Sequence, residues 1–548
     1  MRSVIATVIM FMMGVGFAHA NTLLFNINGY SMEDGKLKHF EAFEFHDGKI
    51  INTYDEKKPN ITADKMIDGM GKTVLPGLID THGHISWHGR ALSSVDLIGT
   101  TDEEDAQKRV KDFLKKPNTT GWLWGRGWNQ EHWPSKKFPT KETLDVLTTD
   151  IAIVLNRIDG HAVWVNSKTL ENVGIDRDTI APKGGQILKD ENGDPTGVLV
   201  DTAMNLVINK MPANDHDVLQ AEILTALNDM VSLGMTSAHD AGVKSDEVRA
   251  LIALREKGIM PARIYAMLDI LDPSNDEYLE AGIITDPTAM MEIRSIKILS
   301  DGTMGSRGAA MMEEYSDSHG HRGDMLFSME ELEHHMTRAM AHGFQVNTHA
   351  IGDRANRVVL DMFEKLQSES LRRKMRHRIE HAQILDADDI NRFVELGVAA
   401  SIHPTHATSD KGMVETRLGQ ERLDEGGYAY RTLVESGAWL GGGSDFPVEP
   451  VNPFYGLHAA VTSQDRDGNP LGGWMPEQTL TREQALDLFT AKAAFLGHQE
   501  TEIGQISPGF WADFIVLDQD YFDIPAEDIW KIKVLNTYVA GREVYSAQ

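Results

Sequence analysis

A repeated alternation of short apolar segments with amphipathic helical stretches constrains the fold of this chain more than any other feature. Each apolar segment ends in polar or charged residues, as strands of a parallel sheet do where they meet a site. The predicted strands occupy residues 74–79, 151–161, 233–242, 295–302, 344–350, 377–384, 398–406 and 439–447. Serial strand–helix order indicates a parallel sheet, and eight such units predict an α/β fold, a closed (β/α)8 TIM barrel.

Short strand-like segments with turn signals occupy both ends of the chain. Residues 21–73 contain LLFNING, FEAFEFHDGKI and MIDGMGKT, and residues 503–548 contain GFWADFIVLD and VLNTYVAGREVYSA. We therefore expect 21–73 and 503–548 to pair into one small composite β-domain beside a barrel of residues 74–502. A last helix begins at Thr481, where Thr481 and Gln484 fit a capping box.

Two segments, at about residues 86–150 and 166–214, interrupt the predicted barrel. The first contains GWLWGRGWNQEHWP, and the second carries turn signals such as ENGDPTG. Insertions at the C-terminal face of a barrel commonly build substrate pockets or lids. The alternative is that the tryptophans form a satellite hydrophobic core.

Residues 1–20 have the pattern of a cleavable signal peptide. Arg2 precedes an apolar run from Val4 to Phe17, and Ala18-His19-Ala20 fits a signal-peptidase site. We expect cleavage after Ala20 and a periplasmic or secreted protein, with an uncleaved anchor as the alternative. No later segment is apolar enough over a sufficient length to cross a bilayer, so we expect no membrane association after cleavage.

The charge balance limits the partners. The formal net charge is −29, and it becomes −30 when the leader is removed, because the leader carries Arg2 and no acidic residue. This charge repels nucleic acids and anionic lipids, so we expect neither as a partner. The charge by itself names no substrate. We expect a small-molecule substrate, and a homo-oligomer stays open. The chain has no cysteine, so a metal site must use nitrogen and oxygen ligands.

The stretch VLPGLIDTHGHI carries the clearest metal-binding pattern. His82 and His84 lie two residues apart at the end of an apolar segment, and side chains at that spacing in a strand point to one face. Further polar residues stand at or near the ends of other predicted strands: Lys297, His349, His381 and Asp445. Because the carboxyl ends of barrel strands converge, we expect these groups to meet in one pocket.

The motifs, taken together, resemble those of the amidohydrolase superfamily, and specifically a branch of amidohydrolase family 3 similar to N-substituted formamide deformylases. They cover nearly all of the chain beyond the leader and include PGLIDTHGHI, LNRIDGHAVWVNS, GMTSAHDAG, IKILSDGTMGSRGAAM, VNTHAIGDRANR, RIEHAQ, HPTHATSD, GGSDFPVEPVNPFYGLHAAV and ISPGFWADFIVLD. The (β/α)8 barrel with a small β-sandwich made from both chain ends, which the resemblance implies, agrees with the strand pattern.

The resemblance also implies a ligand set. His82 and His84 would bind one metal, His349 and His381 a second, and a carboxylated Lys297 would bridge them. A carbamate supplies two anionic oxygens, whereas an ammonium would be repelled by divalent ions. Two zinc ions suit these ligands, although manganese, iron or cobalt would also fit, and a one-metal site with an unmodified lysine is the alternative.

Asp445 is the expected catalytic residue. Beside the first metal, its carboxylate can act as a ligand, accept a proton as hydroxide attacks, and return that proton to the leaving nitrogen. Candidate substrate-binding residues are His161, His239, Asp301, Arg307 and His403. His403 stands where the family pattern leads us to expect glutamine, and Ser463 stands where arginine is expected, which puts the identity of the substrate in doubt rather than the reaction.

We therefore expect an exported metal-dependent hydrolase that cleaves a carbon–nitrogen bond other than a peptide bond, in an N-substituted amide, a formamide or a cyclic amide. The same site could act on an ester, a lactone or a phosphotriester. From another class, the chain could be a non-catalytic binding or regulatory protein on the same scaffold.

Overall fold

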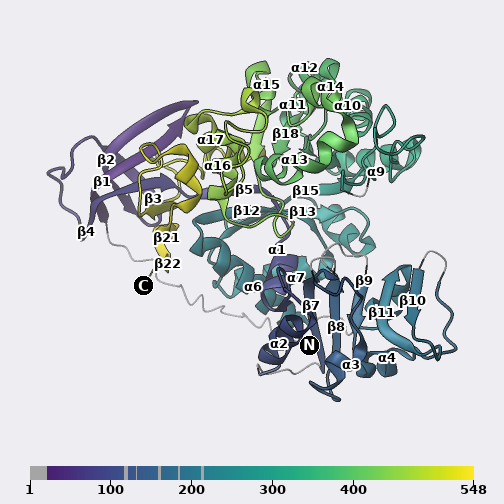
Figure 1. Cartoon of the computed structure of the whole chain (residues 1–548). Coiled ribbons are helices and arrows are strands. Elements are labelled where there is room, and N and C mark those ends of the chain that lie inside the picture. Colours follow the sequence, from purple (N-terminus) through teal and green to yellow (C-terminus); the bar gives the residue numbers. More distant parts are fainter. Residues whose placement is uncertain are drawn as a thin grey trace, which may run out of the picture. The chain divides into compact units, whose positions relative to one another are not determined.

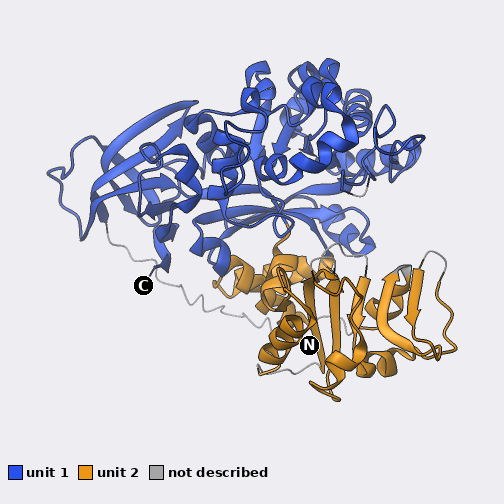
Figure 2. Cartoon of the chain, in the orientation of Figure 1, with its two compact units in different colours: residues 1–83, 228–244, 261–548 blue, residues 84–227, 245–260 orange. Residues whose placement is uncertain are grey.

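The computed structural model describes residues 21–115, 121–130, 133–157, 162–182, 185–211, 215–305 and 307–547. The predicted signal peptide, residues 1–20, and the predicted substrate-binding residue His161 lie outside the described residues. The chain divides into two compact units, which Figure 2 colours separately. The first comprises Met1–Gly83, Asn228–Lys244 and Pro261–Gln548, and the second comprises His84–Leu227 and Ser245–Met260.

An eight-stranded parallel barrel forms the centre of the first unit (Figure 1), as the strand–helix pattern predicts. In sheet order its strands are β5 (Leu78–Gly83), β12 (Met235–Val243), β13 (Arg263–Asp269), β15 (Met291–Leu299), β16 (Gln345–Ala350), β17 (Arg378–His381), β18 (Ala399–Ile402) and β19 (Trp439–Gly442), and β14 (Ile284–Thr285) pairs with β15. The two outer strands meet where a bridge joins Gly83 to Phe446 and the Asp445 amide donates to the His82 carbonyl over 2.8 Å. These contacts close the barrel.

One member of the predicted strand series is wrong. The segment 151–161 contains β8 (Ala152–Arg157), which belongs to the sheet of the second unit, and the third barrel strand is β13. The sequence misleads because a strand covered on both faces is a continuous apolar run in either sheet. β13 also begins with a charged residue, Arg263, which is buried against Asp513 with Nε–Oδ2 and Nη2–Oδ1 distances of 2.6 and 2.9 Å.

Helices follow the barrel strands in chain order. Those of the first unit are α8 (Asp276–Ala281), α9 (Met329–Ala341), α10 (Asp353–Leu366), α11 (Glu369–Met375), α12 (Ala387–Leu396), α13 (Pro404–Leu418), α14 (Gln420–Gly426), α15 (Tyr430–Ser436), α16 (Pro453–Thr462), α17 (Arg482–Leu488) and α18 (Ala491–Leu496). The predicted capping box between Thr481 and Gln484 is present at the start of α17. None of the helices in the described ranges is long and apolar enough to cross a membrane.

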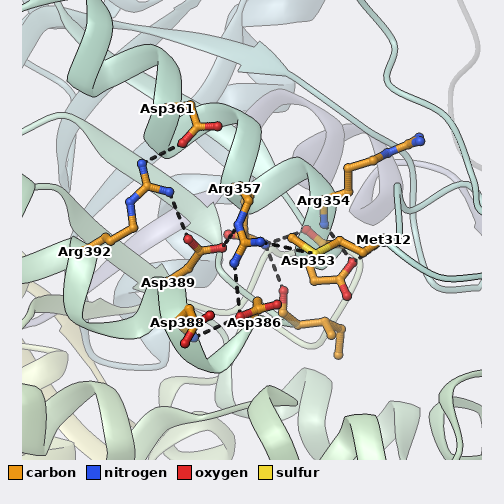
Figure 3. Close-up of polar contacts among 12 residues, drawn as sticks. Met312, Asp353, Arg354, Arg357, Asp361, Asp386, Asp388, Asp389 and Arg392 are labelled. Atoms are coloured by element: carbon orange, nitrogen blue, oxygen red, sulfur yellow. Dashed lines mark hydrogen bonds and ion pairs between the residues drawn. The ribbon is translucent and has the colours of Figure 1, made fainter.

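Ion pairs connect α10 to the start of α12 (Figure 3). Arg357 Nε lies 2.8 Å from Asp389 Oδ2, and Arg392 Nη1 lies 2.9 Å from Asp389 Oδ1. Asp386, just before α12, pairs with Arg357 at 3.1 Å, and Asp361 of α10 pairs with Arg392 at 2.7 Å. Asp389 therefore holds two guanidinium groups at the junction of the two helices.

Both ends of the chain form one small β-domain, as predicted. Its seven-stranded sheet has the order β22 (Arg542–Ser546), β21 (Val534–Val539), β20 (Phe514–Leu517), β4 (Lys65–Pro76), β1 (Thr22–Glu33), β2 (Lys36–His46) and β3 (Lys49–Tyr54). Three strand spacings separate β20 from β2, about 14 Å in a flat sheet. The rings of Phe43 and Phe514 nevertheless lie 5.0 Å apart, so the sheet folds over an aromatic core.

The second unit contains a six-stranded sheet of its own. In sheet order the strands are β10 (Gly185–Lys189), β11 (Pro195–Asp201), β9 (Ala162–Val165), β8, β7 (Trp122–Trp128) and β6 (Val95–Asp96). The helices are α1 (Ile85–Leu92), α2 (Glu103–Phe113), α3 (Lys141–Asp145), α4 (Ser167–Val173), α5 (Asn205–Ile208), α7 (Ser245–Glu256) and most of α6 (His216–Ser232). Trp128, Trp133 and Trp164 are buried in its core, which supports the satellite-core interpretation of the tryptophan-rich segment.

Candidate metal centre

Five of the six predicted ligands lie together at the carboxyl ends of the barrel strands. His82, Lys297, His349 and His381 stand on β5, β15, β16 and β17, and Asp445 follows β19. Lys297 Nζ lies 2.9 Å from His82 Nε2, His82 Nε2 lies 3.6 Å from Asp445 Oδ1, and the rings of His349 and His381 are 4.5 Å apart. All five residues are buried.

His84, the sixth, is the first residue of the second unit. It precedes α1 at the position of the helix N-cap, and its ring lies 5.8 Å from that of Trp87. Gly83 alone separates it from His82 in the chain.

A charged network fixes the orientation of His82. Its Nδ1 donates to Glu380 Oε2 over 2.6 Å, and Glu380 accepts two further bonds from Arg378, at 2.8 and 2.9 Å. All three side chains are fully buried. A carboxylate on one ring nitrogen leaves the lone pair on the other, Nε2, which faces the cluster.

The network was not predicted, although the sequence contains its signal. Arg378 and Glu380 alternate in the motif RIEH, so a buried strand carries two opposite charges on one face. Charges buried in that way require partners.

Burial changes the protonation of the cluster. It lowers the pKa of Lys297 to about 8 and that of His403 to about 3. The pKa of His381 falls well below its usual range because of burial and because His349 and His403 lie beside it. His381 and His403 are therefore neutral at pH 7, and neutral imidazoles can donate a lone pair to a metal.

Four ring nitrogens of histidines in and beside the cluster are buried without hydrogen-bond partners among the described residues. They are His381 Nδ1, both ring nitrogens of His403, and His406 Nε2. Within the described part of the first unit, two sets of three donor atoms lie within 4.8 Å of one another: His82, His381 and His403, and His381, His406 and Asp445. Leaving such atoms unsatisfied costs about 1–3 kcal/mol each. A divalent metal fits this donor set, because a cation would satisfy several of them at once.

Asp445 is held in place by Asp80. The Asp80 carboxylate accepts from the His82 amide at 2.9 Å, from the Ser444 amide at 3.1 Å and from Ser444 Oγ at 2.7 Å. Burial raises the pKa of Asp80 to about 7, and these bonds oppose the rise. Asp80 thus joins the end of β5 to the loop that carries Asp445.

The backbone around the site is specialised. Asp445 and His381 have φ angles of 61° and 74°, in the left-handed region that residues with a side chain rarely occupy. A Cβ on Gly443 would lie 2.7 Å from Asp80 Oδ1 and 3.2 Å from His403 Nδ1. Only glycine lets the chain pass between these two groups.

His406 is a site residue that the sequence interpretation missed. Its Nε2 lies 3.7 Å from Asp445 Oδ2, and its ring stacks on that of His381 with centroids 5.8 Å apart. His403 precedes α13 at the N-cap position, and His406 follows three residues later in the first turn. The signal was the spacing in HPTH, since residues three apart share one face of a helix.

Asp301 and Arg307, predicted to bind substrate, have protein partners. The Asp301 carboxylate accepts from the amides of Ala310, Ile351 and Gly352 at 2.9–3.1 Å, and its Oδ1 lies 3.3 Å from His349 Nε2. Arg307 pairs with Asp317 at 2.6 Å. These contacts give both residues a structural role, and substrate contact stays a prediction.

His239 lies inside the barrel. It is fully buried on β12, its Nδ1 is 2.8 Å from Arg378 Nη1, and its ring contacts Tyr265 with centroids 4.7 Å apart. Burial and Arg378 lower its pKa well below the usual range. His239 therefore supports the Arg378–Glu380 pair, and the prediction that it binds substrate finds no support in these contacts.

Comparison with known proteins places the chain in a family. The profile of the amidohydrolase family matches residues 65–545. The chain is 32% identical to Protein LONG AFTER FAR-RED 3 of Arabidopsis thaliana, over 87% of this chain and 82% of that protein. It is 26% identical to the N-substituted formamide deformylase of Arthrobacter pascens, over 90% of this chain and 92% of the deformylase.

A solved structure shows the same architecture. The crystal structure of an uncharacterized metal-dependent hydrolase from Pyrococcus horikoshii OT3 superposes with a TM-score of 0.78 at 26% identity, covering 92% of this chain and 99% of that one. Three observations support the same assignment to a family: the barrel, the cluster of histidines around Asp445, and the profile match over residues 65–545. This chain belongs to the amidohydrolase family and is a metal-dependent hydrolase.

Proposed function

We propose that this protein is an exported amidohydrolase that cleaves a carbon–nitrogen bond other than a peptide bond, in an N-substituted amide, a formamide or a cyclic amide. The observation that carries the proposal is the buried set of imidazoles beside Asp445, in which His82 is oriented by Glu380. The similarity to an N-substituted formamide deformylase over most of both chains supports the choice of bond.

The proposed cofactor is a pair of zinc ions. His82 and His84, two residues apart at the end of β5, would hold one ion with Asp445, and His349 and His381 would hold the other. When bound, a divalent metal supplies Lewis-acid polarisation of the substrate carbonyl and lowers the pKa of water.

Lys297 is proposed to carry a carboxylate on Nζ as a bridging ligand. Carbamate formation requires the neutral amine, which attacks CO2 and loses a proton. Burial lowers the pKa of Lys297 to about 8, so the neutral fraction near pH 7–8 is far larger than for an exposed lysine. Its position 2.9 Å from His82 Nε2 puts the modified group beside a proposed ligand.

Asp445 is the proposed proton carrier. Its Oδ1 faces His82 and its Oδ2 faces His406, so the carboxylate borders the cluster. It would take a proton from the attacking water and deliver it to the nitrogen of the leaving amine, which leaves in neutral form. His381 and His403 do not compete for that proton, because burial keeps both neutral.

Location and partners are proposed from the sequence. The leader pattern supports export to the periplasm or beyond, and the negative charge supports a small-molecule substrate rather than nucleic acid or a membrane surface. A homo-oligomer is compatible with the proposed location and with the proposed substrate class.

A panel of substrates tests the proposal. Protein beginning at Asn21 and loaded with zinc is offered N-substituted formamides, N-acyl amines, cyclic amides, carboxylic esters, lactones, phosphotriesters and dipeptides, and product release is followed for each. Turnover of the first three classes at least about tenfold above the others, abolished by a chelator, supports the proposal. Preference for esters, lactones or phosphotriesters would show that the enzyme cleaves another bond than the one proposed. Absence of turnover on the whole panel favours a binding protein.

A further inference from the structure

His403 is a buried histidine of the site whose two ring nitrogens both lack a hydrogen-bond partner among the described residues. The residue is 1% exposed. Each nitrogen of an imidazole carries either a polar N–H or a lone pair, so both nitrogens of His403 need a partner that the described residues do not supply. The ligand set expected from the family contains no residue at this position.

The surroundings of His403 define a place for one ion. The ring centroids of His82, His381 and His403 form a nearly equilateral triangle with sides of 5.0, 4.6 and 5.0 Å. One donor nitrogen of each lies within 4.8 Å of the other two. Glu380 holds Nδ1 of His82, so the nitrogen that His82 offers to the cluster is Nε2.

Local structure holds His403 in that position. The Tyr430 hydroxyl donates to the His403 carbonyl over 3.0 Å, and Pro404 follows as the first residue of α13. On the other side, the missing side chain of Gly443 leaves space for Nδ1 of the ring. The imidazole therefore reaches the cluster from a fixed backbone.

We propose that the first equivalent of divalent metal binds to three imidazoles, His82, His381 and His403, and that His403 is a metal ligand of this protein. Three histidines with an open fourth position are typical of catalytic zinc sites and favour zinc or cobalt over magnesium or manganese. The inference rests on the proposed metal-dependent function and concerns the order in which the site is filled. When the second ion binds, His381 would pass from the first ion to the second, which gives the two-zinc arrangement proposed above.

X-ray absorption at the zinc edge, on protein given one equivalent of zinc, tests the proposal directly. The wild type is expected to show three imidazoles per zinc, and His403→Gln two. Loss of a residue that only hydrogen-bonds to a ligand already costs about 10–100-fold in metal affinity, so loss of a ligand itself should weaken zinc binding at least about 100-fold in competition with a chelator. His458→Gln is the control, because His458 is buried on α16 next to Thr462 and belongs to neither donor set of the first unit.

Two results overturn the proposal: a wild-type zinc shell with two or fewer imidazoles, or a folded His403→Gln protein with unchanged shell and affinity. A wild-type shell with two or fewer imidazoles overturns the proposal even where the variant does not fold. The substrate panel at saturating zinc is a separate readout, since a three-imidazole shell without turnover rejects the proposed reaction and leaves the metal site standing.

Discussion

His82 Nδ1 donates to Glu380 Oε2 across 2.6 Å, and both side chains are completely buried. Arg378 balances the charge of the carboxylate and donates two hydrogen bonds to it. The bond to Glu380 therefore determines which ring nitrogen His82 presents to the site. A carboxylate partner also makes that nitrogen a stronger metal ligand.

Replacing Glu380 by glutamine should weaken zinc binding about 10–100-fold, because the neutral amide is a poorer acceptor for the Nδ1–H of His82. Competition with a chelator measures the change. Glu435→Gln, at a 62% exposed position paired with Arg431, provides the matched control and should bind zinc as the wild type does. Equal affinities for Glu380→Gln and wild type would contradict the role given to this bond.

Asp445→Asn should reduce kcat by about 10²–10⁴-fold, because an amide cannot take up and return a proton. The amide oxygen still reaches the cluster, so most of the bound metal should be retained. Steady-state kinetics and elemental analysis on one preparation separate the two effects. A variant that keeps its turnover would show that another group carries the proton.

Much of the fold and part of the site follow from the sequence, and the exceptions have physical causes. Seven of the eight barrel strands, the composite end domain and the strand-end positions of His82, His349 and His381 are encoded by local patterns. The assignment of β8 to the barrel was wrong because double-sided burial leaves no periodic signal, and β13 was overlooked because its Arg263 is neutralised by Asp513, 250 residues away. Partners at that separation are visible only in three dimensions.

The same limit applied to the site. Sequence placed the ligands at strand ends but gave no distance between Glu380 and His82, which lie 298 residues apart. It assigned His403 to the substrate because the residue type departs from the family pattern, whereas the structure places the ring beside both His82 and His381.

His377 should make stability depend on pH. Its Nδ1 accepts from the Val346 amide at 3.0 Å, and burial lowers its folded pKa to about 3 from 6.5. Between pH 6.5 and pH 3, His377 is protonated more readily in the unfolded chain than in the folded one. The contribution of the neutral His377 to the free energy of unfolding is therefore complete above pH 6.5 and is lost as the pH falls toward 3, by up to about 1.4 kcal/mol per pH unit.

Thermal unfolding of wild type and His377→Asn from pH 4.5 to 7.5 checks this, since asparagine keeps an acceptor for Val346 and cannot be protonated. The variant is expected to be less stable at pH 7.5 but to lose less stability on acidification. Parallel pH profiles for the two proteins would exclude His377 as a source of the acid sensitivity.

Asp389 should contribute far more to stability than Asp361, although both pair with Arg392 (Figure 3). Asp389 is 1% exposed and also holds Arg357, whereas the Asp361 side chain is 57% exposed. We expect Asp389→Asn to destabilise the fold by about 1–3 kcal/mol, below the cost for a fully buried pair because the arginines reach solvent. Asp361→Asn should cost about 0–1 kcal/mol. Urea unfolding compares them, and equal losses would show that burial of Asp389 does not matter.

Zinc titration of metal-free protein tests whether two bound ions run the hydrolysis. Turnover of an N-substituted formamide is followed as zinc is added stepwise in the presence of bicarbonate, and the bound zinc is measured at each step. We expect no turnover without metal, full turnover near two equivalents, and loss of the second equivalent in Lys297→Ala. Complete turnover by the metal-free protein, or a wild type that binds no zinc, would exclude the zinc-dependent mechanism.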